Sequence, residues 1–134
     1  MASVLIWIIV NAGRQRKKGD RQQMGMDAEL FGLGRFKRSI VGHLDYPEDF
    51  YEDTPEDCEI LTLVFSCNTA QSSEDLARCL EIDPWKFESH RLTLTDQILE
   101  DLKAFAKEYS MQDSWEDLEA LAKAGFTFQY MPNG

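Results

Sequence analysis

Three cysteines and two histidines are the residues of this chain that could take part in nucleophilic chemistry. Cys67 is the best candidate nucleophile, because it follows the apolar run Ile60–Ser66 and precedes a polar loop that leads into a predicted helix. A helix N-terminus stabilises a thiolate and so lowers the pKa of a nearby thiol. Catalysis would also need a base such as a histidine, and the chain has two, His43 and His90. The alternative interpretation is a buried structural cysteine, and the sequence favours it.

Motifs for cofactors and metals are missing from the sequence. Gly32 and Gly34 match the first two positions of a dinucleotide-binding loop, but the third position is not glycine, and no Gly-Lys-Ser/Thr occurs. An odd number of widely spaced cysteines is neither a disulfide framework nor a zinc motif: Cys58, Cys67 and Cys79. The acidic residues lack the alternating spacing and the glycine of a calcium loop. We therefore predict no cofactor and no metal.

The most unusual segment is DYPEDFYEDTPEDCE, residues 45–59, in which eight of fifteen residues are acidic and none is basic. Its Glu-Asp pairs recur every four residues, a spacing that places side chains on one face of a helix. Pro47 suits the first turn of a helix, and Pro55 disfavours helix at Thr54. The sequence therefore predicts a short helix over Glu48–Asp53, on which like charges repel unless something positive lies near.

Two arrangements would bring positive charge to this acidic segment. In the first, Arg35, Lys37 and Arg38 fold back and form salt bridges with it. In the second, the segment is presented to a basic partner, with its aromatic side chains as anchors inside a ring of carboxylates. The residues of this predicted partner-binding surface are Asp45, Tyr46, Glu48, Asp49, Phe50, Tyr51, Glu52, Asp53, Glu56 and Asp57. The positions of the cations and the rings distinguish the two arrangements.

Length and charge limit the class of function further. A chain of 134 residues can bury one core, and residues 24–134 are expected to form a single domain. These residues hold nine basic and 23 acidic side chains, a net charge of −14. Such a surface repels phosphate backbones and attracts cationic proteins. We predict a basic protein partner and no direct binding of nucleic acid by residues 24–134.

The first 23 residues differ from the rest, with five basic residues and one acidic residue. The apolar run Val4–Val10 is too short to span a bilayer, and the positive charges follow it, whereas a secretory signal has them in front. We therefore expect no membrane span, and the unpaired cysteines indicate the reducing cytoplasm. One interpretation of the segment is an extra strand over Ser3–Val10. The other is that residues 1–23 are a translated leader, with the natural start at Met24 or Met26.

Periodicity and turn residues predict the elements that position these side chains. Strands are expected over residues 26–33, 60–66 and 126–130, with an edge strand in 85–92. Helices are expected over residues 35–44, 74–82, 95–109 and 115–124. Gly32 and Gly34 are expected to form a turn, and residues 60–66 to lie in the middle of the sheet, covered on both faces. The fold class is α+β, a small sheet of about four strands with three to four helices mainly on one face.

These observations indicate a small acidic binding protein that is not an enzyme and that docks on the basic cleft of a nucleic-acid-binding protein. Inhibitors and immunity-type proteins of bacteria or phages are the functional class that we expect, on grounds of charge, size and the lack of catalytic motifs. The alternative is a small enzyme or ligand-binding domain that uses Cys67 with His43 or His90 and has an unusually reactive thiol.

Overall fold

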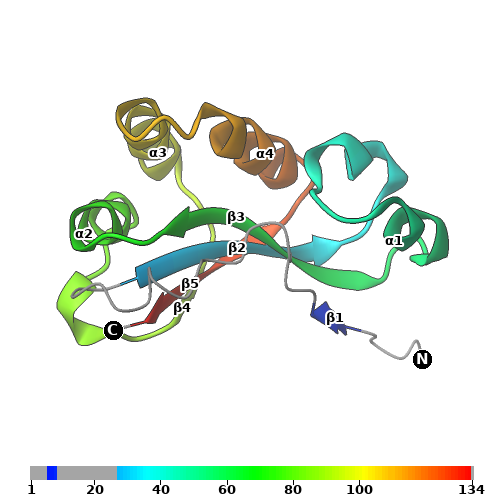
Figure 1. Cartoon of the computed structure of the whole chain (residues 1–134), viewed down its shortest axis with the longest axis horizontal. Helices are drawn as coiled ribbons and strands as arrows, with labels where there is room; N and C mark the ends of the chain where they lie inside the picture. Colours follow the sequence, from blue (N-terminus) through cyan, green and yellow to red (C-terminus); the bar gives the residue numbers. More distant parts are fainter. Residues whose placement is uncertain (1–5, 9–26, 134) are drawn as a thin grey trace.

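A sheet covered by helices on one face makes up the protein in the computed structural model, which describes residues 6–8 and 27–133 (Figure 1). Four antiparallel strands form the sheet: β2 (Asp27–Arg35), β3 (Glu59–Cys67), β4 (His90–Leu92) and β5 (Thr127–Asn133). A three-residue strand, β1 (Ile6–Ile8), pairs with β3 in parallel, so the order is β1-β3-β2-β5-β4. The predicted α+β class is confirmed.

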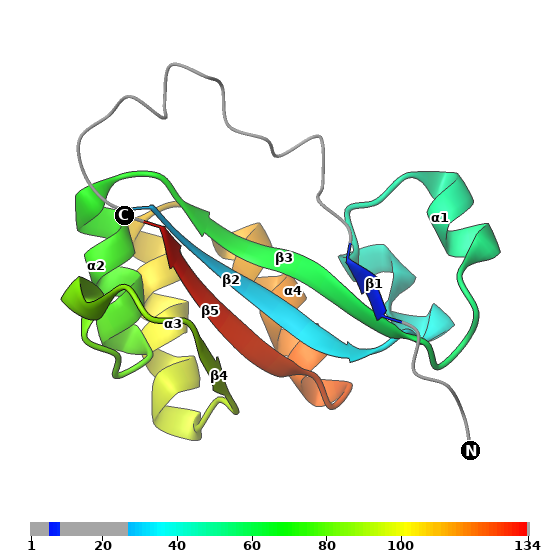
Figure 2. The same ribbon diagram turned by 90° about the horizontal axis from the view of Figure 1, so that it is seen from below.

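Three helices lie on the same side of the sheet: α2 (Ala70–Cys79), α3 (Asp96–Glu108) and α4 (Gln112–Lys123). Seen from below, the opposite face of the strands has no described helix over it (Figure 2). The short helix α1 (Glu48–Asp53) and the 3-10 helix η3 (Arg38–His43) connect β2 to β3 at the end of the sheet remote from α2 (Figure 2). A second 3-10 helix, η4 (Pro84–Lys86), precedes β4. In the described residues, no helix is long and apolar enough to cross a membrane.

The core lies between the sheet and this helix layer. Alternate residues of β2 are buried, as a strand with one covered face requires. The largest fully buried side chains come from the strands, from the helices and from the connection that follows β2: Leu30, Phe36, Ile60, Val64, Phe65, Leu76, Leu102, Leu118, Leu121, Phe128 and Tyr130. The central strand of the order is β2, and β3 is buried mainly on alternate positions, with Leu61 and Leu63 only half-buried. Residues 60–66 do lie inside the sheet, since β3 pairs with β1 on one side and β2 on the other, but the expectation that both faces of this strand are covered is wrong.

Gly32 and Gly34 lie inside β2 and do not form the expected turn. The strand continues to Arg35, which pairs with Glu59 of β3. The Phe126 ring occupies the space beside Gly34, where an added Cβ would lie 2.5 Å from Cγ of that ring. A glycine in a strand often marks such a close approach of a neighbouring group, and Gly34 is such a position.

Several expected helices have different bounds. The helix predicted over residues 35–44 is the six-residue η3, in which Ile40 is buried. The helix α2 begins four residues earlier than expected, because the Thr69 hydroxyl accepts the backbone N–H of Ser72 at 3.1 Å. The predicted helical turn over Glu48–Asp53 is confirmed as α1. Gly125, with φ of +95°, follows α4 at the position where a glycine commonly ends a helix.

Of the N-terminal segment, residues 1–23, the structure describes only residues 6–8. Residues 6–8 form β1, which lies within the strand expected over residues 3–10. The remainder of that strand and the proposed leader of residues 1–23 lie outside the described residues.

Candidate functional site

The aromatic side chains of the acidic segment hold α1 against the body of the protein. Tyr46 is buried, and Phe50 and Tyr51 are half-buried. The Phe50 ring meets the rings of Tyr46 and Phe36 edge-on, with centroids 4.6 and 6.0 Å away. Edge-to-face contacts of this kind add to the stabilisation that burial of the rings provides. The prediction that Tyr46, Phe50 and Tyr51 are exposed anchors for a partner is therefore wrong, because the apolar side of α1 faces the core.

Hydrogen bonds satisfy the polar ends of the two tyrosines. The Tyr46 hydroxyl donates to the carbonyl of Leu61 in β3 at 2.8 Å. The Tyr51 hydroxyl donates to the carbonyl of Leu44 and accepts the backbone N–H of Tyr46 at 3.0 Å. A buried hydroxyl with no hydrogen bond is destabilising, so these bonds allow both rings to pack inward and fix the path of the chain around α1.

Arg38 binds the C-terminal end of α1. Its guanidinium donates to the carbonyl of Tyr51 and, at 2.8 Å, to that of Thr54. The same group lies 5.2 Å from the centroid of the Phe36 ring, within the range of a cation–π contact. The last carbonyls of a helix have no intrahelical partner and carry partial negative charge, so a cation stabilises them. Arg38 therefore connects η3 to α1 through backbone carbonyls and not through the α1 carboxylates.

Glu56 and Asp57 are paired within the protein. Lys37 binds the Asp57 carboxylate, and this hydrogen bond holds the pKa of that carboxyl below its ordinary value. Arg35 donates to the carbonyl of Asp57 at 2.8 Å, and the backbone N–H of Arg38 donates to the Glu56 carboxylate at 3.2 Å. Of the three predicted salt bridges, that of Lys37 is found in the described residues, whereas Arg35 and Arg38 contact this end of the segment through backbone groups. Glu56 and Asp57 therefore do not belong to a free partner-binding surface.

Four carboxylates of α1 remain exposed, and we refer to them as the acidic face: Glu48, Asp49, Glu52 and Asp53. In the part of the chain that the structure describes, none of them has an ion pair or a hydrogen bond. Asp45 is also exposed but does interact with another group, so it is not counted in the acidic face. The acidic face therefore carries concentrated negative charge on a helix that is fixed on its other side and at its end.

Cys67 does not have the environment of a nucleophile. It is buried at the end of β3, and burial raises the pKa of its thiol to about 12. The expected lowering of this pKa by the helix N-terminus is not found, because desolvation of the thiolate is the larger effect. The thiol is therefore protonated at neutral pH.

The two histidines are distant from Cys67. His43 lies in η3, which follows the end of β2 that pairs with Glu59, and its Nδ1 is 3.6 Å from an Asp117 carboxylate oxygen. Cys67 pairs with the opposite end of β2, about 25 Å away along the strands at about 3.3 Å per residue. His90 lies in β4, three strands across the sheet from β3, a distance of about 14 Å. The geometry does not assemble a cysteine–histidine pair.

Burial of Cys67 leads to a testable expectation about its reactivity. In a chain with Cys58→Ser and Cys79→Ser, we expect a thiol reagent at neutral pH to label Cys67 at least about 100-fold more slowly than an exposed model thiol. Labelling in urea serves as the control and should be as fast as that of the model thiol. Rapid labelling of the folded protein would contradict both the burial and the raised pKa.

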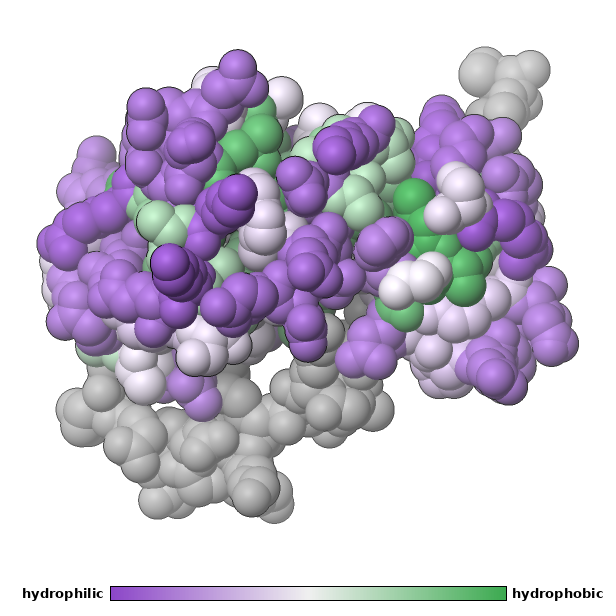
Figure 3. Space-filling view, turned by 90° about the horizontal axis from the view of Figure 1, so that it is seen from above, coloured by the Kyte–Doolittle hydropathy of each residue, from purple (hydrophilic) through white to green (hydrophobic). Residues whose placement is uncertain are grey.

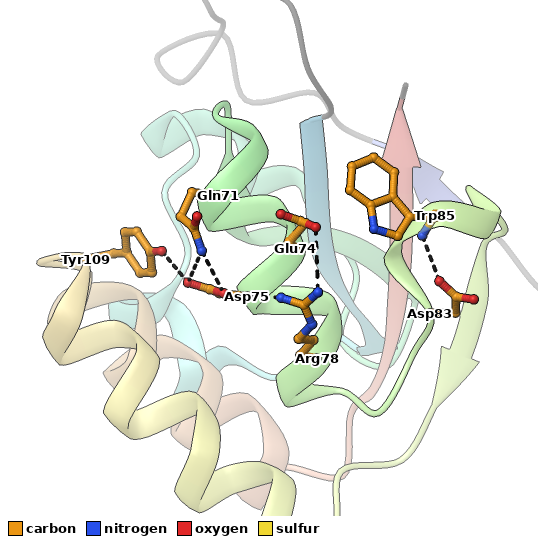
Figure 4. A network of polar contacts seen from close by, with 7 residues as sticks. All are labelled: Gln71, Glu74, Asp75, Arg78, Asp83, Trp85 and Tyr109. Atoms are coloured by element: carbon orange, nitrogen blue, oxygen red, sulfur yellow. Dashed lines mark hydrogen bonds and ion pairs between the residues drawn. The ribbon is translucent and has the colours of Figure 1, made fainter.

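The structure contains a polar network around Asp75 that the sequence did not predict (Figure 4). The Asp75 carboxylate accepts hydrogen bonds from the Tyr109 hydroxyl and from the Gln71 amide, which is 3.1 Å away. The hydrogen bond to Asp75 raises the pKa of Tyr109 to about 12. Arg78 lies 3.6 Å from the Glu74 carboxylate. The network joins α2 to the end of α3, and no sequence signal relates residues 34 positions apart.

No metal site emerges from the described residues, since none of their His, Cys, Asp and Glu side chains form a group of three or more that could hold an ion. The acidic face is distinguished from other exposed charges by having four unpaired carboxylates on six consecutive residues of one short helix. Comparisons with family models, with curated proteins and with solved structures gave no match for this chain.

Proposed function

We propose that this protein is a non-enzymatic binding protein whose acidic face contacts a basic surface of another protein. One observation carries the proposal: the four exposed carboxylates of α1 have no positive partner in residues 6–8 and 27–133. Like charges four residues apart on a helix destabilise it by a few tenths of a kcal/mol per pair. A positive partner would offset that repulsion, so the carboxylates of α1 destabilise the helix less in the complex than in the free protein.

The anchoring of α1 supports this proposal. The buried rings and the guanidinium of Arg38 hold the helix in place before any partner arrives. A binding surface that is already ordered loses less conformational entropy in the complex. The aromatic residues therefore contribute to binding by positioning the carboxylates, and they do not contact the partner.

Charge determines what kind of partner fits. With the aromatic rings turned inward, contact at the acidic face depends on carboxylates, which steer association and are screened by salt. Side chains of Lys and Arg that are arranged to bind phosphates present a matching surface, as in the cleft of a nucleic-acid-binding protein. The negative charge of residues 24–134 favours the approach of such a protein and disfavours nucleic acid itself. An inhibitor or immunity-type role is the form of this function that we favour.

Charge reversal of the acidic face tests the proposal. We expect the variant Glu48→Lys, Asp49→Lys, Glu52→Lys, Asp53→Lys to bind its partner at least about 100-fold more weakly, because like charges facing each other across an interface cost several kcal/mol. The measurement is quantitative mass spectrometry of proteins from the native host retained by the immobilised chain, at low and at high salt, followed by titration of the purified partner.

A matched variant separates the acidic face from total charge. It reverses four exposed carboxylates elsewhere that have no ion pair among the described residues: Glu88, Glu108, Asp113 and Glu116. This variant is expected to keep the same basic partner and the same salt dependence. Equal loss in both variants, or a partner that the face-reversed chain retains at high salt, is incompatible with the proposal.

A further inference from the structure

An open groove lies between α3 and α4, away from α1. Its volume is about 400 Å3, within the range of ligand sites in proteins. The floor of the groove is apolar and consists of four half-buried side chains: Leu94, Leu99, Trp115 and Ala122. The view onto the helix layer shows apolar surface exposed between polar ridges (Figure 3). The groove therefore offers apolar contact area that the fold does not use.

Charged side chains of both signs line the two walls. Glu100 and Lys103 lie three residues apart on α3, and Glu119 and Lys123 lie four apart on α4. All four are exposed, and no ion pair joins any of them to another described residue.

Unpaired charges at these spacings contrast with α2 of the same chain. Residues three and four apart on a helix commonly pair when their charges are opposite. Arg78 does so, lying 3.6 Å from Glu74 and 4.0 Å from Asp75. On α3 and α4 both carboxylates and both ammonium groups stay available at the groove. Each wall can therefore bind a negative or a positive group of a ligand.

Trp115 adds one more polar group to the groove. Among the described residues its indole N–H has no acceptor, and this nitrogen is not among the buried atoms that lack a hydrogen bond. It is therefore accessible as a donor. An indole next to apolar side chains combines a large apolar surface with one hydrogen bond, a combination that suits binding sites.

We infer that this groove binds a small zwitterion with a large apolar body, the chemistry of an apolar amino acid. The floor would receive the apolar body, Lys103 and Lys123 the carboxylate, and Glu100 and Glu119 the ammonium group. A second, more polar cavity between α2 and α3 does not offer the same chemistry, because its Arg78 is already next to Asp75. The acidic face forms no part of the groove, so this inference is independent of the proposed function.

Ligand binding in the groove can be measured by the fluorescence of Trp115, which lies in the lining of the groove. The chain has three tryptophans, and a variant with Trp7→Phe and Trp85→Phe retains Trp115 as its only one. We expect L-leucine to change the fluorescence of Trp115 saturably, with calorimetry giving the same dissociation constant. Leucinamide, which lacks the carboxylate, and 4-methylpentanoate, which lacks the ammonium group, are expected to bind at least about tenfold more weakly, since each loses a charge-assisted contact.

Two sets of neutral variants assign the contacts. Lys103→Gln with Lys123→Gln should weaken leucine binding about tenfold and leave leucinamide binding unchanged. Glu100→Gln with Glu119→Gln should also weaken leucine binding about tenfold and leave the binding of 4-methylpentanoate unchanged. These side chains are exposed, so an unchanged melting temperature should show that the fold is intact. The face-reversed variant of the preceding subsection should bind leucine like the wild type, which separates failure of one proposal from failure of the other.

Three results would overturn the inference. The first is no saturable change with leucine or with phenylalanine as the probe. The second is equal affinity for leucine and for its two singly charged analogues, which would mean that the charged groups of the ligand do not contribute to binding. The third is saturation by an amphipathic helical peptide and by none of the small molecules, which would identify the groove as a protein-docking surface.

Discussion

Arg38→Ala is expected to lower the free energy of unfolding by about 2–3 kcal/mol, because it removes two hydrogen bonds from a charged group. Each such bond contributes at most about 1.5–3 kcal/mol, and the exposure of Arg38 to solvent weakens both. The side chain donates to the carbonyls of Tyr51 and Thr54 and lies over the Phe36 ring. Without it the end of α1 loses its positive partner. Urea denaturation gives the stability, and hydrogen exchange of the amides in residues 50–54 should show faster local opening.

Two further variants make this expectation specific. Arg38→Lys is expected to recover little, because one ammonium group cannot reproduce the planar geometry with which a guanidinium reaches two carbonyls. Arg91→Ala removes another exposed arginine that has no ion pair among the described residues, and should change stability by less than about 0.5 kcal/mol. Equal stabilities of the Arg38→Ala and Arg91→Ala chains would show that the contacts of Arg38 do not stabilise α1.

The same variant bears on the proposed function. Arg38→Ala leaves all four carboxylates of the acidic face in the sequence but removes a contact that holds their helix in place. If pre-ordering of α1 contributes to binding, this variant should bind a basic partner more weakly than wild type at equal salt. Unchanged affinity would show that the carboxylates act without the help of a fixed helix.

Gly34→Ala is expected to destabilise the protein by about 1–3 kcal/mol through overpacking. The new Cβ would lie 2.5 to 2.8 Å from three atoms of the Phe126 ring, which is itself buried and cannot move away freely. Gly42→Ala is the matched control, because nothing lies within 4 Å of the position of its Cβ. There the substitution should be neutral or stabilise by up to about 1 kcal/mol, since alanine has less freedom in the unfolded chain. Thermal or urea unfolding measures both.

A smaller side chain at position 126 should relieve the clash. We expect Gly34→Ala and Phe126→Leu to be non-additive, with the double variant more stable than the sum of the single effects predicts. Additive effects, or equal stabilities of Gly34→Ala and Gly42→Ala, would mean that the strand shifts to accept the methyl group and that Phe126 does not require glycine there.

Local chemistry in the sequence was sufficient for several elements. Pro47 and Pro55 act on the backbone of their own neighbours, so the bounds of α1 were predictable without knowledge of the fold. Gly125 ends α4 for a similarly local reason, since its φ of +95° is a conformation that glycine adopts readily. The helix expected over residues 95–109 is α3, and its buried residues Ile98, Leu102 and Phe105 have the apolar spacing of an amphipathic helix.

The candidate site could be predicted only in part. Charge and spacing identified the acidic face, because Glu48, Asp49, Glu52 and Asp53 are adjacent in the chain. The roles of Tyr46, Phe50 and Tyr51 depended on whether the other side of α1 meets a core, and a periodic pattern does not say what covers it. The groove between α3 and α4 was missed for the same reason, since Leu99 and Trp115 come from different helices.

By itself the sequence determined the α+β class, the position of α1 and the concentration of negative charge, because each depends on residues that are near one another in the chain. Tertiary structure alone decided that Arg38 binds the backbone of α1, that Cys67 is buried with a raised pKa, and that Gly34 lies in a strand beneath Phe126. Each of these depends on a contact between distant residues, and such contacts form only when the chain has packed.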